Sequence, residues 1–325
     1  MNYEIHDKTI SAIHQCIQNS DRIALFCHIR PDGDTIGSVL GLGWALQAAG
    51  KEVQFISQDD IPSQDRLRFE DYVDTSPFQK TPGLFDCSIL LDISDIQRAG
   101  DYFSKNETCI PDICIDHHPS NIGIARINWI DSEKAATAVI IAKLIPLLGL
   151  SFNKKTASAL LSGILTDTQG FTTRNTDSET LQIASEMIQH GADLYEITQS
   201  VMMAHSFEAG KYWSFGLAKM QRDGKLLWSV LKSEDKEKSG YPGNDDANLI
   251  NYLSTTEAIQ IALLFVEQSP QSVKISWRGR PGVDVASIAK KFGGGGHVLA
   301  AGATINQSFE SIFQEVLNET KKAIA

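Results

Sequence analysis

Histidine and aspartate side chains follow short apolar runs in the first half of this 325-residue sequence. The run IALFC at 23–27 ends in His28, and Asp32 and Asp34 follow across a Pro-Asp-Gly turn. The turn accounts for the proline and the glycine, but it does not require the histidine. Two further runs, SILLD and DICIDHH, also end in polar side chains, namely Asp92, Asp116, His117 and His118. This pattern predicts that strand ends deliver imidazole and carboxylate groups to one place.

Neutral imidazoles with several carboxylates suit Mn²⁺ or a similar divalent ion, whereas structural zinc favours a tetrahedron of cysteine and histidine. So many acids would repel one another unless cations bound among them. The candidate ligands include one more aspartate, from LTDTQGF, and are His28, Asp32, Asp34, Asp92, His117 and Asp167. Their four aspartates balance two divalent cations. Two ions about 3.5 to 4 Å apart lower the pKa of a shared water and hold a phosphoryl oxygen, which is phosphoester hydrolysis chemistry.

Each of these side chains also has an ordinary structural interpretation. Asp32 alone is a typical turn former, and Asp92 could cap the turn after its strand. His117 and His118 could simply end a strand, and helix ends such as the one near Asp167 attract polar residues. The hypothesis of a metal site therefore rests on the joint occurrence of these groups at separate strand ends.

The elements that must position these groups alternate between strand and helix patterns. Apolar runs with the length and β-branched content of buried strands occur at 22–28, 52–58, 87–93 and 112–118. Helical patterns occur at 35–50, 136–150 and 155–167. Strand, helix and strand at this spacing predict a right-handed crossover and a parallel sheet. Ligands gather beyond the carboxyl ends of the strands in such a sheet.

The pattern changes near residue 190. Helix is predicted over 190–213, and strands are predicted at 225–232, 258–268 and 272–279, with a polar surface loop at 233–246. Because a single core stops growing at about 250–300 residues, two domains are expected. We therefore predict an α/β fold with a parallel-sheet catalytic domain, helices on both faces, over 1–190. A helical linker over 191–215 and a smaller α/β domain with a mixed sheet over 216–325 would follow.

Composition restricts the function. The formal net charge of −11 argues against a binder of long duplex nucleic acid, whose affinity comes largely from Lys and Arg. No apolar run reaches the roughly 18 to 20 residues of a membrane span, and the N-terminus lacks the features of a secretory signal. A cytoplasmic protein without membrane association is predicted. The cysteines form no CxxC pair and are interpreted as small apolar residues: Cys16, Cys27, Cys87, Cys109 and Cys114.

Five sequence motifs carry a resemblance to a known family. HIRPDGD, LLDISDIQR, DHH and LTDT resemble, in this order, the four motifs of the DHH phosphoesterase superfamily. DVASIAKKFGGGGHVLAAGA at 284–303 resembles the glycine-rich signature of the DHH-associated C-terminal domain. The size and the GGGGH segment are similar to those of the bacterial nanoRNase/pAp phosphatase group. This resemblance implies Mn²⁺-dependent cleavage of very short RNA oligomers and removal of the 3′-phosphate from adenosine 3′,5′-bisphosphate (pAp).

The resemblance also implies roles by motif position, with two Mn²⁺ ions per subunit and Mg²⁺ or Co²⁺ as possible substitutes. One ion would take His28, Asp32 and Asp92. The other would take Asp34, Asp92, His117 and Asp167, so that Asp92 bridges the two. Catalytic roles fall to His118, which would face the scissile phosphate, and to Asp116, which would support the histidines. The fourth motif commonly reads DTG before an aromatic residue, whereas this chain has DTQGF and departs at Gln169.

The second domain is predicted to bind substrate. A glycine run lets the backbone approach an anion and point N–H groups at it. The guanidinium of an arginine can grip a phosphate with two N–H groups. The candidate substrate-binding residues are Arg98, Arg278, Gly294, Gly295, Gly296 and His297. With a cleft between the domains, only the first phosphates of an RNA would meet positive charge, which favours short substrates.

Several functions remain open at this point. The preferred one is a metal-dependent phosphohydrolase acting on oligoribonucleotides of a few residues and on 3′-phosphorylated adenine nucleotides. The runner-up is a phosphodiesterase for cyclic or linear dinucleotides, such as cyclic di-AMP or pApA. Length and acidity disfavour a RecJ-like exonuclease, and the GGGGH segment is not expected in a family II pyrophosphatase. A non-catalytic nucleotide-binding regulatory module would lack a metal ligand, and a homodimer is compatible with each of these functions.

Overall fold

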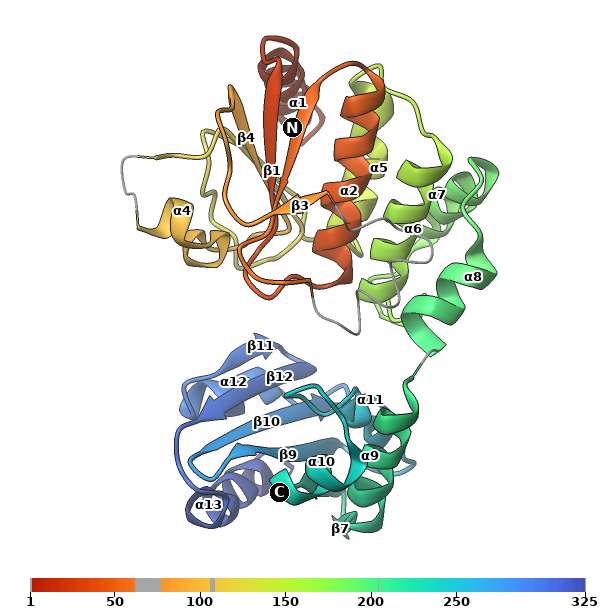
Figure 1. Ribbon diagram of the computed structural model, residues 1–325. Helices are drawn as coiled ribbons and strands as arrows, with labels where there is room; N and C mark the ends of the chain where they lie inside the picture. The colour runs from red at the N-terminus through yellow and green to blue at the C-terminus, as the bar shows by residue number, and fades with distance from the viewer. Residues whose placement is uncertain (1, 62–76, 106–108, 204, 325) are drawn as a thin grey trace. The chain divides into compact units, whose positions relative to one another are not determined.

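The computed structural model describes residues 2–61, 77–105, 109–203 and 205–324 (Figure 1). The chain divides into two compact units, Met1–Ala204 and His205–Ala325. This division falls within 191–215, the segment predicted as a helical linker. Of the helices in that segment, α8 (Leu194–Thr198) belongs to the first unit and α9 (Phe207–Ala218) belongs to the second.

The first unit contains a six-stranded sheet in the order β3-β2-β1-β4-β5-β6, in which every neighbouring pair is parallel. Its strands are β1 (Arg22–Phe26), β2 (Glu52–Ile56), β3 (Phe78–Gln79), β4 (Cys87–Leu91), β5 (Ile113–Asp116) and β6 (Ile127–Ile130). The four predicted strands and their parallel arrangement are confirmed. The two edge strands, β3 and β6, lack a long apolar run, so the sequence pattern did not indicate them.

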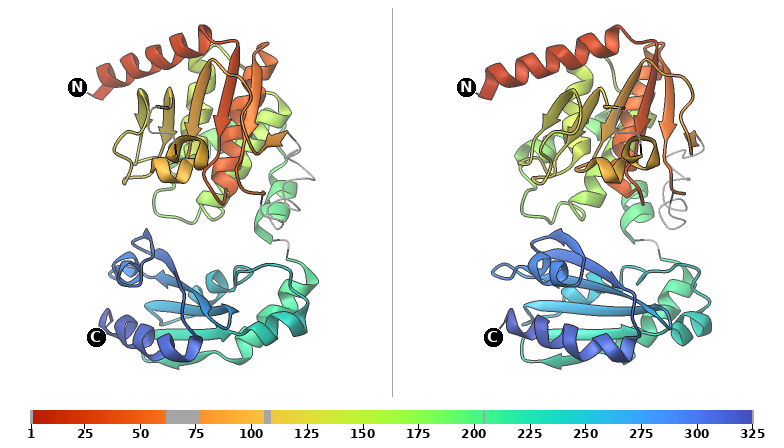
Figure 2. Two further views of the ribbon diagram at one scale, coloured as in Figure 1. Left: turned by 60° about the vertical axis from the view of Figure 1, so that its left-hand side comes forward. Right: turned by 90° about the vertical axis from the view of Figure 1, so that its left-hand side faces the viewer.

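Side chains alternate across this sheet and enter two cores. Ile23 and Leu25 of β1 belong to the larger core, whereas Ala24 and Phe26 face a smaller one on the other side. The larger core is closed by helices α1 (Asn2–Gln18), α2 (Gly33–Ala48), α5 (Thr137–Leu147), α6 (Lys154–Asp167) and α7 (Ser178–Gln189). The smaller core is covered by the 3₁₀ turn η1 (Ile96–Ala99) and by α4 (Asp101–Ser104). Helices therefore lie on both faces, as predicted (Figure 2).

Helices α2 and α6 approach each other closely because small residues line their contact. A Cβ atom added at Gly163 in α6 would lie 3.1 Å from Asp34 Oδ1 and 2.9 Å from the Cβ of Ala138 in α5. The first turn of α2, the first turn of α5 and the last turn of α6 thus converge. This convergence brings Asp34 to the end of the helix that carries Asp167.

The second unit has a mixed six-stranded sheet in the order β11-β12-β10-β9-β8-β7, in which only β8 and β9 pair in parallel. Its strands are β7 (Gln221–Asp223), β8 (Leu226–Leu231), β9 (Ile261–Ser269), β10 (Ser272–Gly279), β11 (Gly295–His297) and β12 (Ala300–Ile305). One face packs against α9, α10 (Ser233–Ser239) and α11 (Leu249–Ser254), and the other against α12 (Val285–Lys291) and α13 (Phe309–Lys322). The predicted mixed sheet is confirmed.

Two local predictions are wrong. The first half of the predicted loop 233–246 is helix α10, because buried Asp235 accepts hydrogen bonds from the backbone N of Lys232 at 2.7 Å and from Lys219 Nζ at 2.5 Å. A buried charged side chain holds this helix in place, and its sequence therefore shows no apolar periodicity. The helix predicted over 190–213 is interrupted: α8 continues into a π-helical turn, η2 (Gln199–Met203), and α9 starts anew after its N-cap, Ser206.

The cysteines follow the sequence-based interpretation. All five cysteines are free, and Cys27, Cys87 and Cys114 are buried. Within the described parts of the chain, no helix combines the length and the apolar character needed to cross a bilayer.

Candidate metal centre

The six predicted ligands lie together at the carboxyl ends of β1, β4 and β5. Their side chains form groups in which each residue offers one ligand atom within 4.8 Å of the others. One group is His28, Asp32 and Asp92, and a second is Asp34, His117 and Asp167. A third group joins Asp92 to His117 and His118. The structure thus assembles the predicted cluster from segments that are far apart in the sequence.

The His28 imidazole is held so that one ring nitrogen faces carboxylates. Its Nδ1 lies 2.9 Å from the carbonyl oxygen of Ile29, which can only accept, so Nδ1 carries the proton. The opposite nitrogen, Nε2, is buried and makes no hydrogen bond. It lies 3.5 Å from Asp32 Oδ2 and 3.7 Å from Asp92 Oδ2. A buried imidazole nitrogen that faces two carboxylates is a donor arrangement that suits a cation.

Asp32 combines the turn role and the predicted ligand role. Its Oδ1 accepts a hydrogen bond of 3.2 Å from the backbone N of Thr35 and caps α2. Its other oxygen, Oδ2, faces His28. The Pro-Asp-Gly turn therefore starts the helix and directs one carboxylate oxygen toward the cluster.

His117 repeats the arrangement of His28 on the other side of Asp92. Its Nδ1 lies 3.2 Å from the carbonyl oxygen of Lys134. Its Nε2 lies 3.5 Å from Asp167 Oδ2, 3.7 Å from Asp92 Oδ1 and 4.0 Å from Asp34 Oδ2. Both histidines thus use Nδ1 to contact the main chain and present Nε2 to the acids.

Backbone groups at the start of α5 orient the central carboxylates. Asp34 accepts hydrogen bonds from the backbone N of Thr137 at 2.7 Å and of Ala138 at 3.0 Å. The Thr137 hydroxyl donates to Asp92 Oδ1 at 3.0 Å. Asp92 has a left-handed backbone conformation with φ of 62°, which lets the chain turn directly after β4. These contacts fix the positions of two acids that would otherwise repel each other.

Burial and mutual repulsion make this cluster favourable for cations. Burial raises the pKa of Asp34 well above its usual value, and the charges of Asp92 and Asp167 raise it further. Burial, with the charge of Asp32, also raises the pKa of Asp92. Asp167 has its pKa raised to about 6 by burial, in spite of nearby His117. The carboxylates and the two imidazoles that face them form a donor set that fits divalent ions.

Asp116 contacts His118, whose Nδ1 also lies 3.6 Å from Asp92 Oδ1. His118 Nδ1 lies 2.7 Å from Asp116 Oδ1. Although burial opposes its protonation, the hydrogen bond and the charge of Asp116 raise the pKa of His118 to about 9. Asp116 is fully buried, and it also accepts hydrogen bonds from the side chain of Asn121 and from the backbone N of His117, both at 2.8 Å. Asp116 therefore orients the His118 imidazole through Nδ1.

Arg98 lies close to the cluster. It belongs to η1, and its carbonyl oxygen accepts a 2.8 Å hydrogen bond from the backbone N of Ile29, next to His28. Its positive charge acts on the pKa values of His28, Asp32 and His118. Among the predicted substrate-binding residues, Arg98 is therefore the one that shares a unit with the candidate ligands.

The fourth motif forms an unusual turn after Asp167. Three successive residues have left-handed backbone conformations, with φ of 49° at Gln169, 70° at Gly170 and 66° at Phe171. The buried hydroxyl of Thr168 bridges the turn: it donates to the carbonyl oxygen of Ile164 at 2.6 Å and accepts from the backbone N of Phe171 at 3.0 Å. Gln169 thus adopts a conformation that glycine takes more readily.

The predicted substrate-binding residues of the second unit share one face of its sheet. The register pairs Arg278 with Ala300 and Ala300 with His297, so these three side chains point to the same side. The small Ala300 separates the two polar side chains. Gly294 lies so close to β12 that an added Cβ would come within 2.2 Å of the carbonyl oxygen of Gly302. Gly294 therefore packs tightly against β12, whereas a Cβ atom added at Gly295 would meet no atom within 4 Å.

Arg278 is oriented by its own unit. Its Nε donates to Asn251 Oδ1 at 2.9 Å, and its Nη1 donates to the carbonyl oxygen of Trp277 at 3.0 Å. Two of the five N–H groups of the guanidinium thus fix its direction. Arg278 and His297 thus give this second candidate site one positive charge and one imidazole.

Several groups that orient the predicted site residues are absent from the sequence-based prediction. They are Asn121, Thr137, Asn251 and the carbonyl oxygen of Lys134. Asn121 follows the DHH motif closely and has a weak signal as a polar residue after a strand. A threonine at a helix start or a main-chain carbonyl has no pattern that marks it as functional.

Two family models match this chain, one in each of its two units. Residues 22–164 match the model of the DHH family, N-terminal domain, and residues 223–325 match the DHHA1 domain. The chain is 33% identical to the bifunctional oligoribonuclease and PAP phosphatase NrnA of Thermus thermophilus, over 93% of this chain and 91% of that protein. It is 28% identical to the NrnA of Bacillus subtilis, covering 88% and 90%. It is 26% identical to the cyclic-di-AMP phosphodiesterase PdeA of Listeria monocytogenes, covering 89% of this chain and 46% of PdeA.

Solved structures extend the likeness of the fold. An exopolyphosphatase-related protein from Bacteroides fragilis superposes with a TM-score of 0.89 at 23% identity, covering 97% of both chains. RecJ from Thermus thermophilus, crystallised with Mn²⁺, superposes with a TM-score of 0.56 at 14% identity, covering 96% of this chain and 53% of RecJ. Both carry the fold described above.

Proposed function

Because this chain belongs to the DHH family of phosphoesterases, we propose that it is a metal-dependent hydrolase that degrades oligoribonucleotides of a few residues and removes the 3′-phosphate of pAp. The NrnA proteins of Thermus thermophilus and Bacillus subtilis, which it matches over 91% and 90% of their length, are named for both activities. The proposal assigns catalysis to the first unit and substrate binding mainly to the second.

One observation carries the proposal, namely the position of Asp92 between two histidines. Its Oδ2 lies 3.7 Å from His28 Nε2, and its Oδ1 lies 3.7 Å from His117 Nε2. The two oxygens of one buried carboxylate thus serve two ligand groups, as a bridging ligand does in a two-metal site. A structural histidine–aspartate pair would need only one of these contacts.

In this proposal His28, Asp32 and Asp92 would hold one ion, and Asp34, His117 and Asp167 would hold the other together with Asp92, which faces His117. Mn²⁺ suits the mixture of carboxylate oxygens and imidazole nitrogens, and Mg²⁺ or Co²⁺ can replace it in such sites. Bound ions would lower the pKa of a water and withdraw charge from the phosphoryl oxygens. The RecJ neighbour, which has the same fold, was crystallised with Mn²⁺.

The remaining residues act on the substrate. Asp116 orients His118 through Nδ1, and His118 would face the scissile phosphate. Arg98 adds positive charge on the same side of the cluster. Water adds to phosphorus, the bond from phosphorus to the 3′-oxygen breaks, and that oxygen takes a proton. The same bond breaks whether the other substituent of the phosphate is hydrogen, as in pAp, or a second nucleoside, as in a dinucleotide.

The second unit would bind the terminal nucleotide. Arg278 and His297 lie on one sheet face with the small Ala300 between them, and the glycine hairpin lets a ligand approach the backbone. A homodimer and a cytoplasmic location, both predicted from the sequence, remain predictions.

The test compares three substrates under identical conditions. The full chain is incubated with an RNA dinucleotide, pAp or cyclic di-AMP, in Mn²⁺ and again after chelation. Metal-dependent hydrolysis of the first two is the expected result. Preference for cyclic di-AMP, the substrate for which PdeA is named, would replace the proposal by a signalling phosphodiesterase. Binding of Mn²⁺ without hydrolysis of any of the three would indicate a regulatory module.

A further inference from the structure

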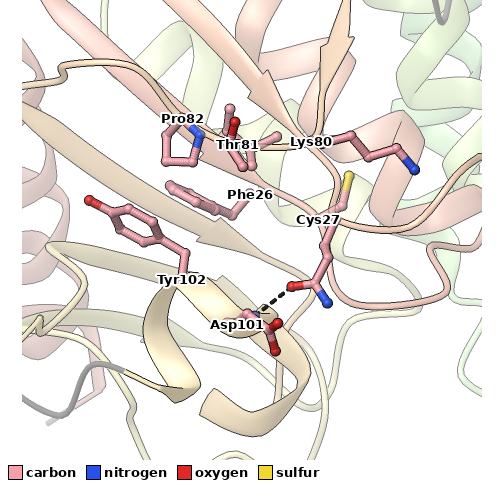
Figure 3. Close-up of a pocket in the computed structure, with 10 residues that line it drawn as sticks. Phe26, Cys27, Lys80, Thr81, Pro82, Asp101 and Tyr102 are labelled. Carbon is pink, nitrogen blue, oxygen red and sulfur yellow. Dashed lines mark hydrogen bonds between the residues drawn. The ribbon is translucent and has the colours of Figure 1, made fainter.

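A pocket of about 410 Å³ lies on the first unit at the carboxyl edge of its sheet (Figure 3). Its walls come from the segments that follow β1, β2 and β3, and from η1 and α4. The residues that matter for its chemistry are Phe26, Cys27, Gln58, Pro82, Ala99 and Tyr102. None of them is among the candidate ligands or the predicted substrate-binding residues.

The pocket borders the candidate metal centre. Cys27, at its wall, is buried and directly precedes His28 in the chain. Ala99, at another wall, follows Arg98. In the sheet, β1 lies between β2 and β4. The pocket therefore occupies the carboxyl ends of β1, β2 and β3, and the candidate ligands occupy those of β1, β4 and β5.

An aromatic surface lines one side of the pocket. The rings of Phe26 and Tyr102 lie 5.7 Å apart with an interplanar angle of 32°. Phe26 is 1% exposed and belongs to the smaller core, whereas Tyr102 is 39% exposed. Figure 3 shows the Tyr102 ring beside Phe26 and Pro82. Tyr102 thus offers a partly open aromatic face on a rigid base.

The polar groups of the pocket do not suit a phosphate. Lys80 lies at its rim but forms an ion pair of 2.6 Å with Asp60, and Asp101 adds an acid to the lining. Gln58 Oε1 accepts a 2.5 Å hydrogen bond from the backbone N of Asp101, which fixes the amide and leaves its NH₂ group as a donor. An uncharged, flat ligand with polar edges matches these walls better than an anion.

We propose that this pocket binds a nucleobase of the RNA substrate by stacking on Tyr102, next to the site of hydrolysis. The inference rests on the proposed function. A dinucleotide and pAp share the nucleoside whose 3′-oxygen is released, so a contact to the other nucleoside affects the dinucleotide alone. The base in the pocket belongs to the other nucleoside, which a dinucleotide has and pAp lacks. The pocket thus selects RNA and contributes nothing to pAp.

The experiment uses the ratio of kcat/KM for the dinucleotide pApA to kcat/KM for pAp, with Mn²⁺. Tyr102→Leu keeps an apolar side chain and removes the aromatic face, so the ratio should fall ~10-fold, since one base–aromatic stack is lost. Tyr102→Phe retains the face and should restore the ratio. Thr81→Trp fills the pocket from an exposed position and should lower the ratio without changing the core.

Tyr195→Leu is the matched control, because Tyr195 is a 68% exposed tyrosine in α8 that does not line the pocket. Its ratio should equal that of the unmodified chain. Thermal unfolding midpoints identify any variant that is misfolded. If Tyr102→Leu is misfolded, the kcat/KM ratio of Thr81→Trp tests the inference instead. An unchanged ratio in the folded variants would overturn the inference. If the unmodified chain hydrolyses neither substrate, the proposed function fails instead.

Discussion

At the scale of single residues, the candidate site is organised around Asp92. Its left-handed backbone, its hydrogen bond from Thr137 and its two facing histidines place both carboxylate oxygens in defined directions. A main-chain carbonyl at Nδ1 orients each imidazole so that Nε2 faces the acids, as is typical of metal-binding histidines. Single substitutions should therefore separate ligands from residues that only stabilise the fold.

We expect Asp92→Ala to abolish metal binding and turnover together, because one side chain serves both ligand groups. Loss of a group that hydrogen-bonds a metal ligand typically lowers metal affinity or activity about 10- to 100-fold. Loss of a ligand that serves both groups should therefore lower kcat by more than ~100-fold. Calorimetric titration with Mn²⁺ and hydrolysis of pAp measure the two effects. Asp86→Ala is the control, since exposed Asp86 precedes β4 at its opposite end. Activity of Asp92→Ala near that of the control would contradict the two-metal assignment.

A second prediction concerns the stability of the metal-free protein between about pH 4 and pH 6. The pKa of Asp167 is raised from 3.8 to about 6, so the folded chain holds this proton more tightly than the unfolded chain. The resulting stabilisation is present below pH 4 and is lost as the pH rises through 6. Asp167→Asn cannot ionise, so in EDTA its stability relative to the unmodified chain should increase across this range.

Urea unfolding of both chains at pH 4, 5, 6 and 7 checks this expectation. Adding Mn²⁺ at pH 7 should stabilise the unmodified chain, because a bound cation favours the ionised carboxylate. It should stabilise Asp167→Asn less. A difference between the two chains that does not change with pH would show that Asp167 titrates normally.

At the scale of elements, the site depends on helix ends as much as on strand ends. Helices α2, α5 and α6 converge at Asp34, whose carboxylate accepts two backbone hydrogen bonds from the first turn of α5. The close approach at Gly163 makes this convergence possible. The turn that follows α6 is the irregular part, because its three left-handed residues include Gln169 and Phe171.

Gln169→Gly should stabilise the protein by about 0.5–1 kcal/mol. Relief of a left-handed conformation gains about 1–2 kcal/mol, and part of this gain is offset by about 0.4–1 kcal/mol because glycine makes the unfolded chain more flexible. Urea unfolding with chelator present measures the difference. Gln169→Ala retains the Cβ atom and is the matched control. Equal stabilities of the two variants would mean that the φ of 49° at this position carries no strain.

At the scale of the whole molecule, charge and domain composition restrict the substrates. The chain has a formal net charge of −11. Binding of two divalent cations would add four positive charges and give a net charge of −7. The positive side chains proposed to contact substrate are few, namely Arg98 and Arg278. A long RNA therefore gains little beyond its first phosphates and is repelled by the remaining surface.

We expect kcat/KM to be lower for a 24-nucleotide RNA than for a dinucleotide at low salt. Raising the salt concentration screens exposed charges beyond about 10 Å at 0.1 M, so it should narrow this difference. Initial rates on both substrates at 20 and 200 mM salt provide the measurement, with pAp as the reference for direct salt effects on the site. Equal rates at low salt would refute a preference for short RNA that depends on charge.

The sequence by itself determined the parallel α/β architecture, the mixed second sheet and the types of residue in the candidate site. Local patterns suffice for these features, because the alternation of apolar runs with helical segments specifies the sheet, and the strand ends specify where polar residues gather. The pairing of His28 and His117 through opposite oxygens of Asp92 is not a local property. It arises where segments from three strands and two helices meet.

The tertiary structure alone decided which groups support the ligands and what lies beside them. Asn121, Thr137 and the carbonyl of Lys134 orient the site through single hydrogen bonds. The pocket at Tyr102 combines segments after three strands with a short helix. Helix α10, which is held in place by the buried Asp235, and the edge strands β3 and β6 were also not predicted. The physical reason is common to all of them: hydrogen bonds and cavities depend on distances between remote segments, whereas periodicity reports only how one segment meets the core.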